Sequence, residues 1–254
     1  MRFASLGSGS RGNATIIEAE DTRILLDCGF AARELEQRLA RLGLEPGALD
    51  AILVTHEHQD HIRGVGALAR RYRIPVWMTQ GTHRQGRCGE LPELHLLAAH
   101  DGGFRIGGIR VVPFPVPHDA REPAQFLFAA GGARLGFLTD AGHWTPHILE
   151  LLASCDALFL ECNHDRDMLA DGPYPPMLQR RVGGEFGHLS NGQALEFLRR
   201  LDSGRLRHLI AAHLSETNNT PQQVRETLLS ELPALEQSLV VARQDVETPW
   251  LELS

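Results

Sequence analysis

Short apolar runs rich in β-branched and aromatic residues recur along the chain, most of them bounded by Gly, Pro or Asp. Such runs are typical of β-strands, because branched and aromatic side chains pack well on a pleated surface. Eleven strands are predicted, over residues 2–6, 14–19, 22–27, 51–55, 76–79, 109–116, 125–130, 133–140, 157–162, 208–213 and 238–243. Their apolar character indicates sheets that are buried on both faces.

Helical spacing of apolar residues occurs between these strands. Leu35 and Leu39 lie four positions apart within residues 31–44, and residues 191–201 repeat the pattern. A third helix is expected over residues 61–73. Strands that are buried on both faces need helices outside them. We therefore expect an α/β protein in which two mixed sheets pack together and helices cover each outer side.

Composition fits a soluble enzyme. The chain has 254 residues, 43% of them hydrophobic, and its net charge of −7 gives no general attraction to nucleic acid. No window holds the roughly 18 apolar residues of a membrane span, and the N-terminus lacks the apolar core of a signal peptide. The four cysteines have no C-x-x-C spacing, which favours reduced thiols. We expect a cytoplasmic protein without membrane contact and, since no linker divides it, one domain over residues 1–254.

Titratable residues stand where several predicted strands stop. They are Asp27, His56, His118, Asp140, Glu161 and His213. Strand ends converge on one edge of a sheet, where residues from distant parts of a chain can meet. The sequence therefore predicts a constructed site.

The stretch THEHQDHIRG, residues 55–64, concentrates this chemistry. In an extended chain His56 and His58 point to the same side, while Asp60 and His61 follow in a turn. Nitrogen and oxygen donors of this kind suit two divalent ions. The alternative is a solvated turn that is rich in histidine. The pattern H-x-H-x-D-H is much more specific than a lone histidine pair and favours a metal site.

This pattern resembles the signature of the metallo-β-lactamase fold superfamily, whose members carry a dinuclear metal centre between two β-sheets in a four-layer αββα sandwich. Four further motifs carry the resemblance: Asp27 in LLDCG, His118 in VPHDA, Asp140 in LTDAG and His213 in AAHLS. The resemblance implies the same α/β fold for this chain.

The resemblance also implies a set of metal ligands. One ion would be held by His56, His58 and His118, and the other by Asp60, His61 and His213, with Asp140 bridging both. A carboxylate has two oxygens and can serve two ions, whereas a neutral imidazole offers one lone pair. Two divalent ions, zinc or manganese, are the expected cofactors. Asp27 is expected to brace the histidine loop by hydrogen bonds, with a plain strand-end turn residue as the alternative.

Five segments are similar to the YycJ/WalJ type of this superfamily, which is related to RNase Z and RNase J. They are SLGSGSRGNAT at 5–15, ECNHD at 161–165, GPYPPMLQRRV at 172–182, GHLSN at 187–191 and AHLSETNN at 212–219. This resemblance implies a 5′-to-3′ DNA exonuclease linked to DNA repair. The stretch between Asp140 and His213 is too short for the inserted cap domain of RNase J, so none is expected.

The expected mechanism uses a metal pair. Two ions roughly 3.5 to 4 Å apart lower the pKa of a bridging water toward about 7, and the hydroxide attacks phosphorus in line. Asp60, Asp140 and His188 are the candidate catalytic residues. His188 would donate a proton to the leaving oxygen or clamp a phosphate. Alternatively GHLSN is a turn in which Ser190 or Asn191 caps a helix.

Three other residues are candidates for supporting or substrate-binding roles. Glu161 is placed to orient His188 or to accept a proton, and His164 to face phosphate. Ser8 belongs to a small-residue loop, 7–13, whose backbone N–H groups would wrap a phosphate. Strand-end polar groups and a plain hairpin turn are the alternatives.

Two other functions remain open. The same dinuclear chemistry suits a hydrolase of small thioesters or lactams, and an RNA-processing nuclease of the RNase Z kind also fits the motifs. A protein that binds metal only for stability is less compatible with two open-sided ions. DNA is the favoured nucleic acid, on the resemblance alone.

Overall fold

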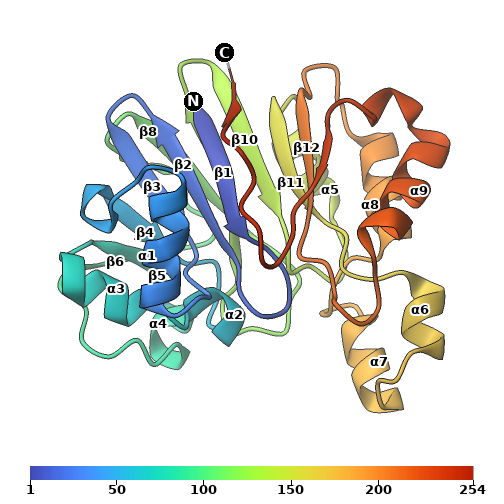
Figure 1. Ribbon diagram of the computed structural model, residues 1–254, viewed down its shortest axis with the longest axis horizontal. Helices are drawn as coiled ribbons and strands as arrows, with labels where there is room; N and C mark the ends of the chain where they lie inside the picture. The colour runs from blue at the N-terminus through green and yellow to red at the C-terminus, as the bar shows by residue number, and fades with distance from the viewer. Residues whose placement is uncertain (254) are drawn as a thin grey trace. The chain divides into compact units, whose positions relative to one another are not determined.

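All eleven strands predicted from the apolar runs are present, and the fold is α/β, with two mixed sheets and flanking helices. Figure 1 shows this computed structural model, which describes residues 1–253. Its contacts divide the chain into two units. Unit 1 comprises residues 1–115, 120–133 and those from 243 onward, and unit 2 comprises residues 116–119 and 134–242. The single domain expected over 1–254 stays a prediction, and residue 254 lies outside the described residues.

The first sheet lies entirely in unit 1. Its strands, in spatial order, are β14 (Leu251–Glu252), β1 (Arg2–Gly7), β2 (Ala14–Ala19), β3 (Thr22–Leu26), β4 (Ala51–Leu53), β5 (Val76–Thr79) and β6 (Leu94–Leu97). Strands β14 to β3 pair antiparallel, and β3 to β6 pair parallel. The parallel half brings the ends of β3 and β4 to the same edge, which positions the residues that follow them.

The second sheet also has seven strands. They are β7 (Phe104–Ile106), β8 (Ile109–Pro115), β9 (Ala124–Ala130), β10 (Ala133–Leu138), β11 (Ala157–Glu161), β12 (His208–Ala212) and β13 (Leu239–Val241). Within unit 1, β7, β8 and β9 form an antiparallel meander. Within unit 2, β10 to β13 pair parallel, so that their C-terminal ends share one edge.

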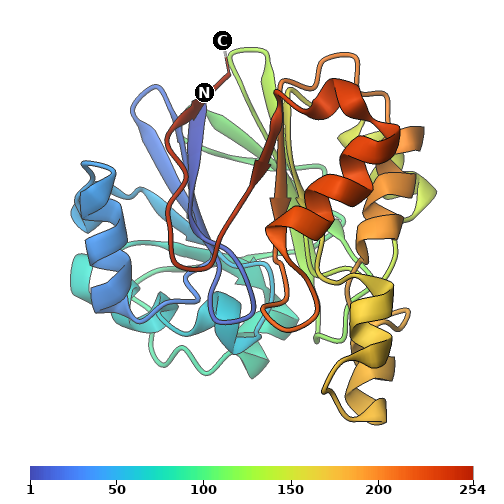
Figure 2. The same cartoon turned by 45° about the vertical axis from the view of Figure 1, so that its right-hand side comes forward.

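Helices cover the sheets in both units. Unit 1 contains α1 (Ala32–Arg41), α2 (Gln59–Ile62), α3 (Val65–Tyr72) and α4 (Gln80–Gln85). Unit 2 contains α5 (Pro146–Leu152), α6 (Arg166–Asp171), α7 (Pro176–Val182), α8 (Asn191–Arg200) and α9 (Pro221–Glu231). Helices α1 and α3 bury Leu35, Leu39 and Leu68 in one core cluster with strand residues of the first sheet. Figure 2 shows α8 and α9 side by side, and α8 also packs on β11.

The helix predicted over residues 61–73 is wrong in its continuity, because it is divided into α2 and α3 at Gly64. The Gly64 N–H donates to the Cys28 carbonyl at 2.8 Å. A Cβ at this position would lie 2.2 Å from the Phe30 carbonyl oxygen, closer than atoms can approach. The close contact with the 28–30 turn therefore interrupts the helix, and only glycine fits there.

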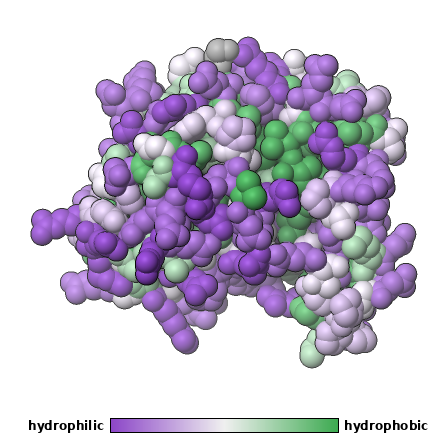
Figure 3. Space-filling model, viewed as in Figure 1, coloured by the Kyte–Doolittle hydropathy of each residue, from purple (hydrophilic) through white to green (hydrophobic). Residues whose placement is uncertain are grey.

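The surface is largely polar. Among residues 1–253 the large apolar side chains that stay exposed are Leu96, Met177, Phe186 and Val246, and the face in Figure 3 is mostly hydrophilic. Across the described residues, no helix combines the length and apolarity needed to cross a bilayer.

Candidate metal centre

The histidine loop of unit 1 follows β4 directly. Residues 54–58 form an irregular segment with bends at Thr55 and Glu57. The short helix α2, which begins at Gln59, carries Asp60 and the loop's last histidine, His61. The ring of His56 lies 4.6 Å from that of His58 and 4.2 Å from that of His61, measured between centroids. Three imidazoles are thus gathered within one short segment.

Asp27 fixes this loop from the neighbouring strand end. One carboxylate oxygen accepts the backbone N–H of Thr55 at 2.8 Å, and the other lies 2.8 Å from Nδ1 of His61. Thr55 Oγ1 donates to the same carboxylate and lies 3.0 Å from Nδ1 of His56. Burial raises the pKa of Asp27, while His61 lowers it in part. Asp27 adopts a left-handed backbone, with φ of 61°, an energetically unfavourable conformation that aspartate tolerates better than most residues.

Asn13 is a site residue that the sequence did not indicate. Its Nδ2 lies 3.2 Å from Nε2 of His61 and 3.5 Å from the Asp60 carboxylate, and its backbone N–H donates to the Asp60 carbonyl at 2.7 Å. Asparagine in a Gly- and Ser-rich loop carries no signal that separates this role from an ordinary turn.

The phosphate-wrapping role of loop 7–13 stays a prediction, and most of the loop's N–H groups already have protein partners. The N–H groups of Gly9 and Arg11 donate to side-chain oxygens of Asn13 and Gln244, and that of Ser8 donates to a backbone carbonyl. Ser8 Oγ donates to Asn13 as well. Most of these backbone donors are therefore bonded to protein oxygens, and the loop places Asn13 beside the histidines.

Unit 2 brings together three strand ends. Leu138 of β10 pairs with Leu160 of β11, and Leu160 pairs with Ala211 of β12. This parallel register sends Asp140, Glu161 and His213 to the same edge, one or two residues beyond the paired positions. The ligand atoms of Asp140, Glu161, His188 and His213 all lie within 4.8 Å of one another. Asp140 and His213 have left-handed backbones, with φ of 53° and 55°.

Glu161 is the hub of this cluster. Its Oε1 lies 2.8 Å from Nδ1 of His188 and 2.9 Å from Nδ1 of His213, and its Oε2 accepts the N–H groups of Ala141 and Leu189. Burial raises the pKa of Glu161, but the positive charge and hydrogen bond of His188 and the hydrogen bond from His213 outweigh it and hold this pKa at about 2. The group is a carboxylate at neutral pH.

The segment that holds His188 also caps the helix that follows it. Ser190 caps α8 by accepting the Gln193 N–H, and Gln193 completes a capping box. The capping interpretation of GHLSN therefore holds, and it leaves His188, two residues earlier, bonded to Glu161. His164, three residues after Glu161, is only 2% exposed.

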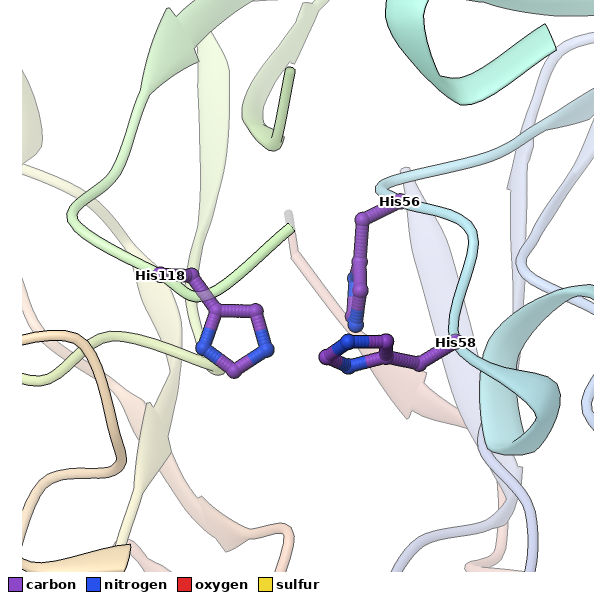
Figure 4. Close-up of side chains that lie close together, drawn as sticks. All are labelled: His56, His58 and His118. Atoms are coloured by element: carbon purple, nitrogen blue, oxygen red, sulfur yellow. The ribbon is translucent and has the colours of Figure 1, made fainter. Parts of the chain in front are cut away.

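His118 follows β8 and belongs to unit 2. Its Nδ1 lies 3.1 Å from the Gly187 carbonyl oxygen, and the N–H of Asp119 donates to the Phe186 carbonyl at 3.0 Å. The 186–187 turn thus fixes the ring of His118. Figure 4 draws this side chain together with those of His56 and His58, which come from the loop after β4.

The histidine donors fit metal binding. In His56, His61, His118 and His213 the Nδ1 atom faces a protein oxygen. That oxygen belongs to a carboxylate in His61 and His213. Histidines that bind metals in proteins usually hold their second ring nitrogen in this way, which leaves Nε2 to the ion. The donor set of each unit, imidazole nitrogen with carboxylate oxygen, suits a zinc-like divalent cation.

Comparisons with known proteins agree with this chemistry. Residues 22–213 match the family described as the beta-lactamase superfamily domain. The exodeoxyribonuclease YycJ of Bacillus anthracis is 32% identical to the chain, over 89% of this chain and 86% of that protein. The exodeoxyribonuclease WalJ of Streptococcus pneumoniae, strain D39, is 31% identical over 91% and 88%.

A solved structure extends the similarity to the whole fold. Zn²⁺-bound PqqB from Methylobacterium extorquens superposes with a TM-score of 0.76 over 100% of both chains, at 18% identity. At that identity the likeness concerns the fold alone. The family match, by contrast, covers most of the chain and includes both strand-end clusters. The chain therefore belongs to the beta-lactamase superfamily and, within it, to the nuclease family of the YycJ and WalJ proteins.

Proposed function

We propose that this enzyme is a metal-dependent exonuclease that degrades DNA in the 5′-to-3′ direction. The names of the two relatives support DNA as the substrate, because the chain is similar to each over most of its length. The observation that carries a hydrolytic role is the Glu161 carboxylate, which holds His188 and His213 by their Nδ1 atoms.

The ligand set is part of the proposal. His56, His58 and His118 would hold one divalent ion, Asp60, His61 and His213 would hold a second, and Asp140 would serve both. Zinc or manganese would supply Lewis-acid polarisation of the phosphate and a nucleophile at neutral pH. Residues 1–254 would work as one domain to do this.

A protein side chain supplies the proton for the leaving oxygen. His188 is 22% exposed in its side chain and faces Glu161 with Nδ1, so its Nε2 is the ring atom left for substrate. The Glu161 carboxylate stabilises the protonated imidazole, which can then donate its Nε2 proton to the leaving oxygen. Asp27 and Thr55 keep the rings of His61 and His56 in fixed orientations.

The first experiment is digestion of end-labelled DNA and RNA, single- and double-stranded, by purified protein reconstituted with Zn²⁺ or Mn²⁺. We expect metal-dependent release of mononucleotides from DNA, with a 5′ label released first and a 3′ label retained until late. Asp140→Ala should abolish release. Hydrolysis of a lactoylglutathione-type thioester, with no activity on any nucleic acid, would overturn the proposal in favour of a small-molecule hydrolase.

We also propose a cellular location and a pathway. All four cysteines are free, and burial raises the pKa of Cys155 and of Cys88 to about 11, as expected for reduced thiols in a cytoplasmic protein. We propose a role in DNA repair, which increased sensitivity of a deletion strain to DNA-damaging agents would test.

A further inference from the structure

A pocket lies in unit 2, between α6, α7 and the first turn of α8. Its volume is about 480 Å³. The cationic side chains of Arg166 and Arg180 line it, together with His164, and Leu169 supplies part of its apolar wall. Figures 1 and 2 show α6 and α7 side by side, which leaves this corner of unit 2 as a two-helix projection. A pocket of this size accommodates a ligand such as one nucleotide.

The two arginines of this pocket are not paired in the part of the chain that the structure describes, although Asp165 and Asp167 flank Arg166 in the sequence. Neither Arg166 nor Arg180 forms an ion pair with any residue of the described chain, 1–253, and no carboxylate is among the lining residues. Nearby arginines behave differently, since Arg181 pairs with Asp119 at 2.6 Å and Arg199 with Glu231 at 3.1 Å. Guanidinium groups recognise phosphate by paired hydrogen bonds, so two of them at one pocket favour a phosphate-bearing ligand.

The remaining polar side chains of the pocket hold its walls together. Gln179 donates to the backbone carbonyls of Ala170 and Gly172, which ties α7 to the end of α6. Gln193 takes part in the capping box of α8 and donates to the Gly142 carbonyl. The walls are therefore preformed, and the arginines are the groups left for a ligand.

His164 connects the pocket to the proposed active site. Its ring is buried, and within residues 1–253 its Nδ1 has no hydrogen-bond partner. Its carbonyl accepts the Asn191 N–H, next to the Ser190 cap. The charges of Glu161 and His188 both influence the pKa of His164, which burial lowers to about 4. The ring is neutral at pH 7 and keeps hydrogen-bonding capacity.

Gly183 leaves the pocket open. It ends α7 with φ of −87° and ψ of 7°, a conformation that any residue adopts. A Cβ there would lie 3.3 Å from Leu169 and 3.9 Å from Nε2 of His164. A larger side chain at this position would occupy the pocket. Residues 183–187 then lead directly to His188, so the pocket and the candidate proton donor flank one short loop.

We infer that this pocket binds one phosphate-bearing nucleotide of the substrate strand, held by Arg166 and Arg180 beside the bond that is cleaved. The inference rests on the proposed function, because it assigns a strand-binding subsite to that same active site. Leu169 would contact the sugar or base while the two guanidinium groups bind the phosphate.

Binding by an inactive protein tests this without cleavage. Fluorescence anisotropy would compare a labelled single-stranded oligothymidylate on Asp140→Ala protein with the same protein carrying Arg166→Gln, Arg180→Gln or Gly183→Leu. We expect each substitution to weaken binding about 5- to 10-fold, and each arginine substitution to lower the salt dependence by about one phosphate contact. Arg199→Gln, which removes the same charge outside the pocket, is the matched control and should bind as the parent does. Circular dichroism would verify that Gly183→Leu is folded.

The outcomes separate the inference from the proposed function. Unchanged oligonucleotide binding in all three variants would overturn the pocket's role, whether or not the protein with Asp140 intact degrades DNA. Binding of thymidine 5′-monophosphate to the same proteins is measured as well. If the variants lose this binding while oligonucleotide binding is unchanged, the pocket serves a free nucleotide and the inference is overturned. Weaker binding in the variants, together with no DNA cleavage by the protein with Asp140 intact, would support the pocket and refute the exonuclease.

Discussion

The histidine loop of unit 1 and the strand edge of unit 2 both orient histidines with a carboxylate. They differ in which parts of the chain supply the residues. In each unit a strand-end carboxylate holds imidazole Nδ1 atoms: Asp27 holds His61, and Glu161 holds His188 and His213. The loop packs its histidines into six consecutive positions, 56–61, whereas the edge draws its residues from three strands and a later turn.

The difference teaches how each cluster depends on its carboxylate. Thr55 also contacts the rings of His56 and His61, so Asp27 is not the only group that orients the loop's histidines. Glu161 contacts the Nδ1 atoms of two histidines and also binds two backbone N–H groups, while Oδ1 of Asp140 lies 3.4 Å from Nδ1 of His213. The edge cluster should therefore tolerate loss of its carboxylate less well than the loop does.

Removing one histidine from each cluster should have the largest effect. We expect His61→Ala and His213→Ala each to lower kcat/KM on DNA by about 10³-fold or more, because the proposal has both bind the same ion. Metal analysis by plasma mass spectrometry should find about one ion per chain in each variant. Exposed His147→Ala serves as the control. Two ions retained in either variant would separate the clusters and break the comparison.

The next effect concerns His188 alone. His188→Gln should lower kcat by about 10²- to 10³-fold, since a general acid contributes on that scale, while metal content stays at the parent level. Single-turnover digestion of end-labelled DNA measures the chemical step directly. A matching loss of metal would instead make His188 a ligand.

Exchange of the two carboxylates for amides should sharpen the comparison. Glu161→Gln and Asp27→Asn keep the side-chain size, and loss of such a supporting carboxylate typically lowers metal affinity or activity about 10- to 100-fold. We expect Glu161→Gln at the upper end, because it disturbs two histidines, and Asp27→Asn at the lower end. Competition with a metal chelator gives both affinities. The reverse order would refute the idea that Thr55 protects the loop.

The smallest effect is on stability in acid, and it concerns unit 2. The pKa of His164 is about 4 when folded, against about 6.5 in an unfolded chain. Between these values the unfolded state binds more protons, so the unfolding free energy falls as the pH drops through this window, by at most about 3 kcal/mol from this residue. Urea unfolding should show a shallower decline for His164→Gln. Equal declines would contradict the assignment.

The sequence predicts most of the fold because buried strands have a strong signature. The three strands that it missed, β6, β7 and β14, all lie at the edges of their sheets. Edge strands are short and partly exposed, as in β6, where the first three residues are not buried. They carry little of the continuous apolar pattern that marks a central strand.

The sequence predicts those site residues whose clustering along the chain is unusual. The titratable cluster at 56–61 is unusual in a sequence, and Glu161 is a candidate because it ends an apolar run. Asn13 and Thr55 were missed, since amides and hydroxyls are common in every turn. Only the meeting of a loop with a strand end gives them a role, and that meeting depends on tertiary contacts.

The left-handed backbone at Asp27, Asp140 and His213 has an evolutionary consequence. Such conformations lower stability by an estimated 1 kcal/mol or more at each non-glycine residue, and glycine would relieve that strain. A laboratory selection for heat resistance alone should drift toward glycine or asparagine at these three positions. A parallel selection that also requires nuclease activity should keep the original residues, if catalysis and not folding sets their identity.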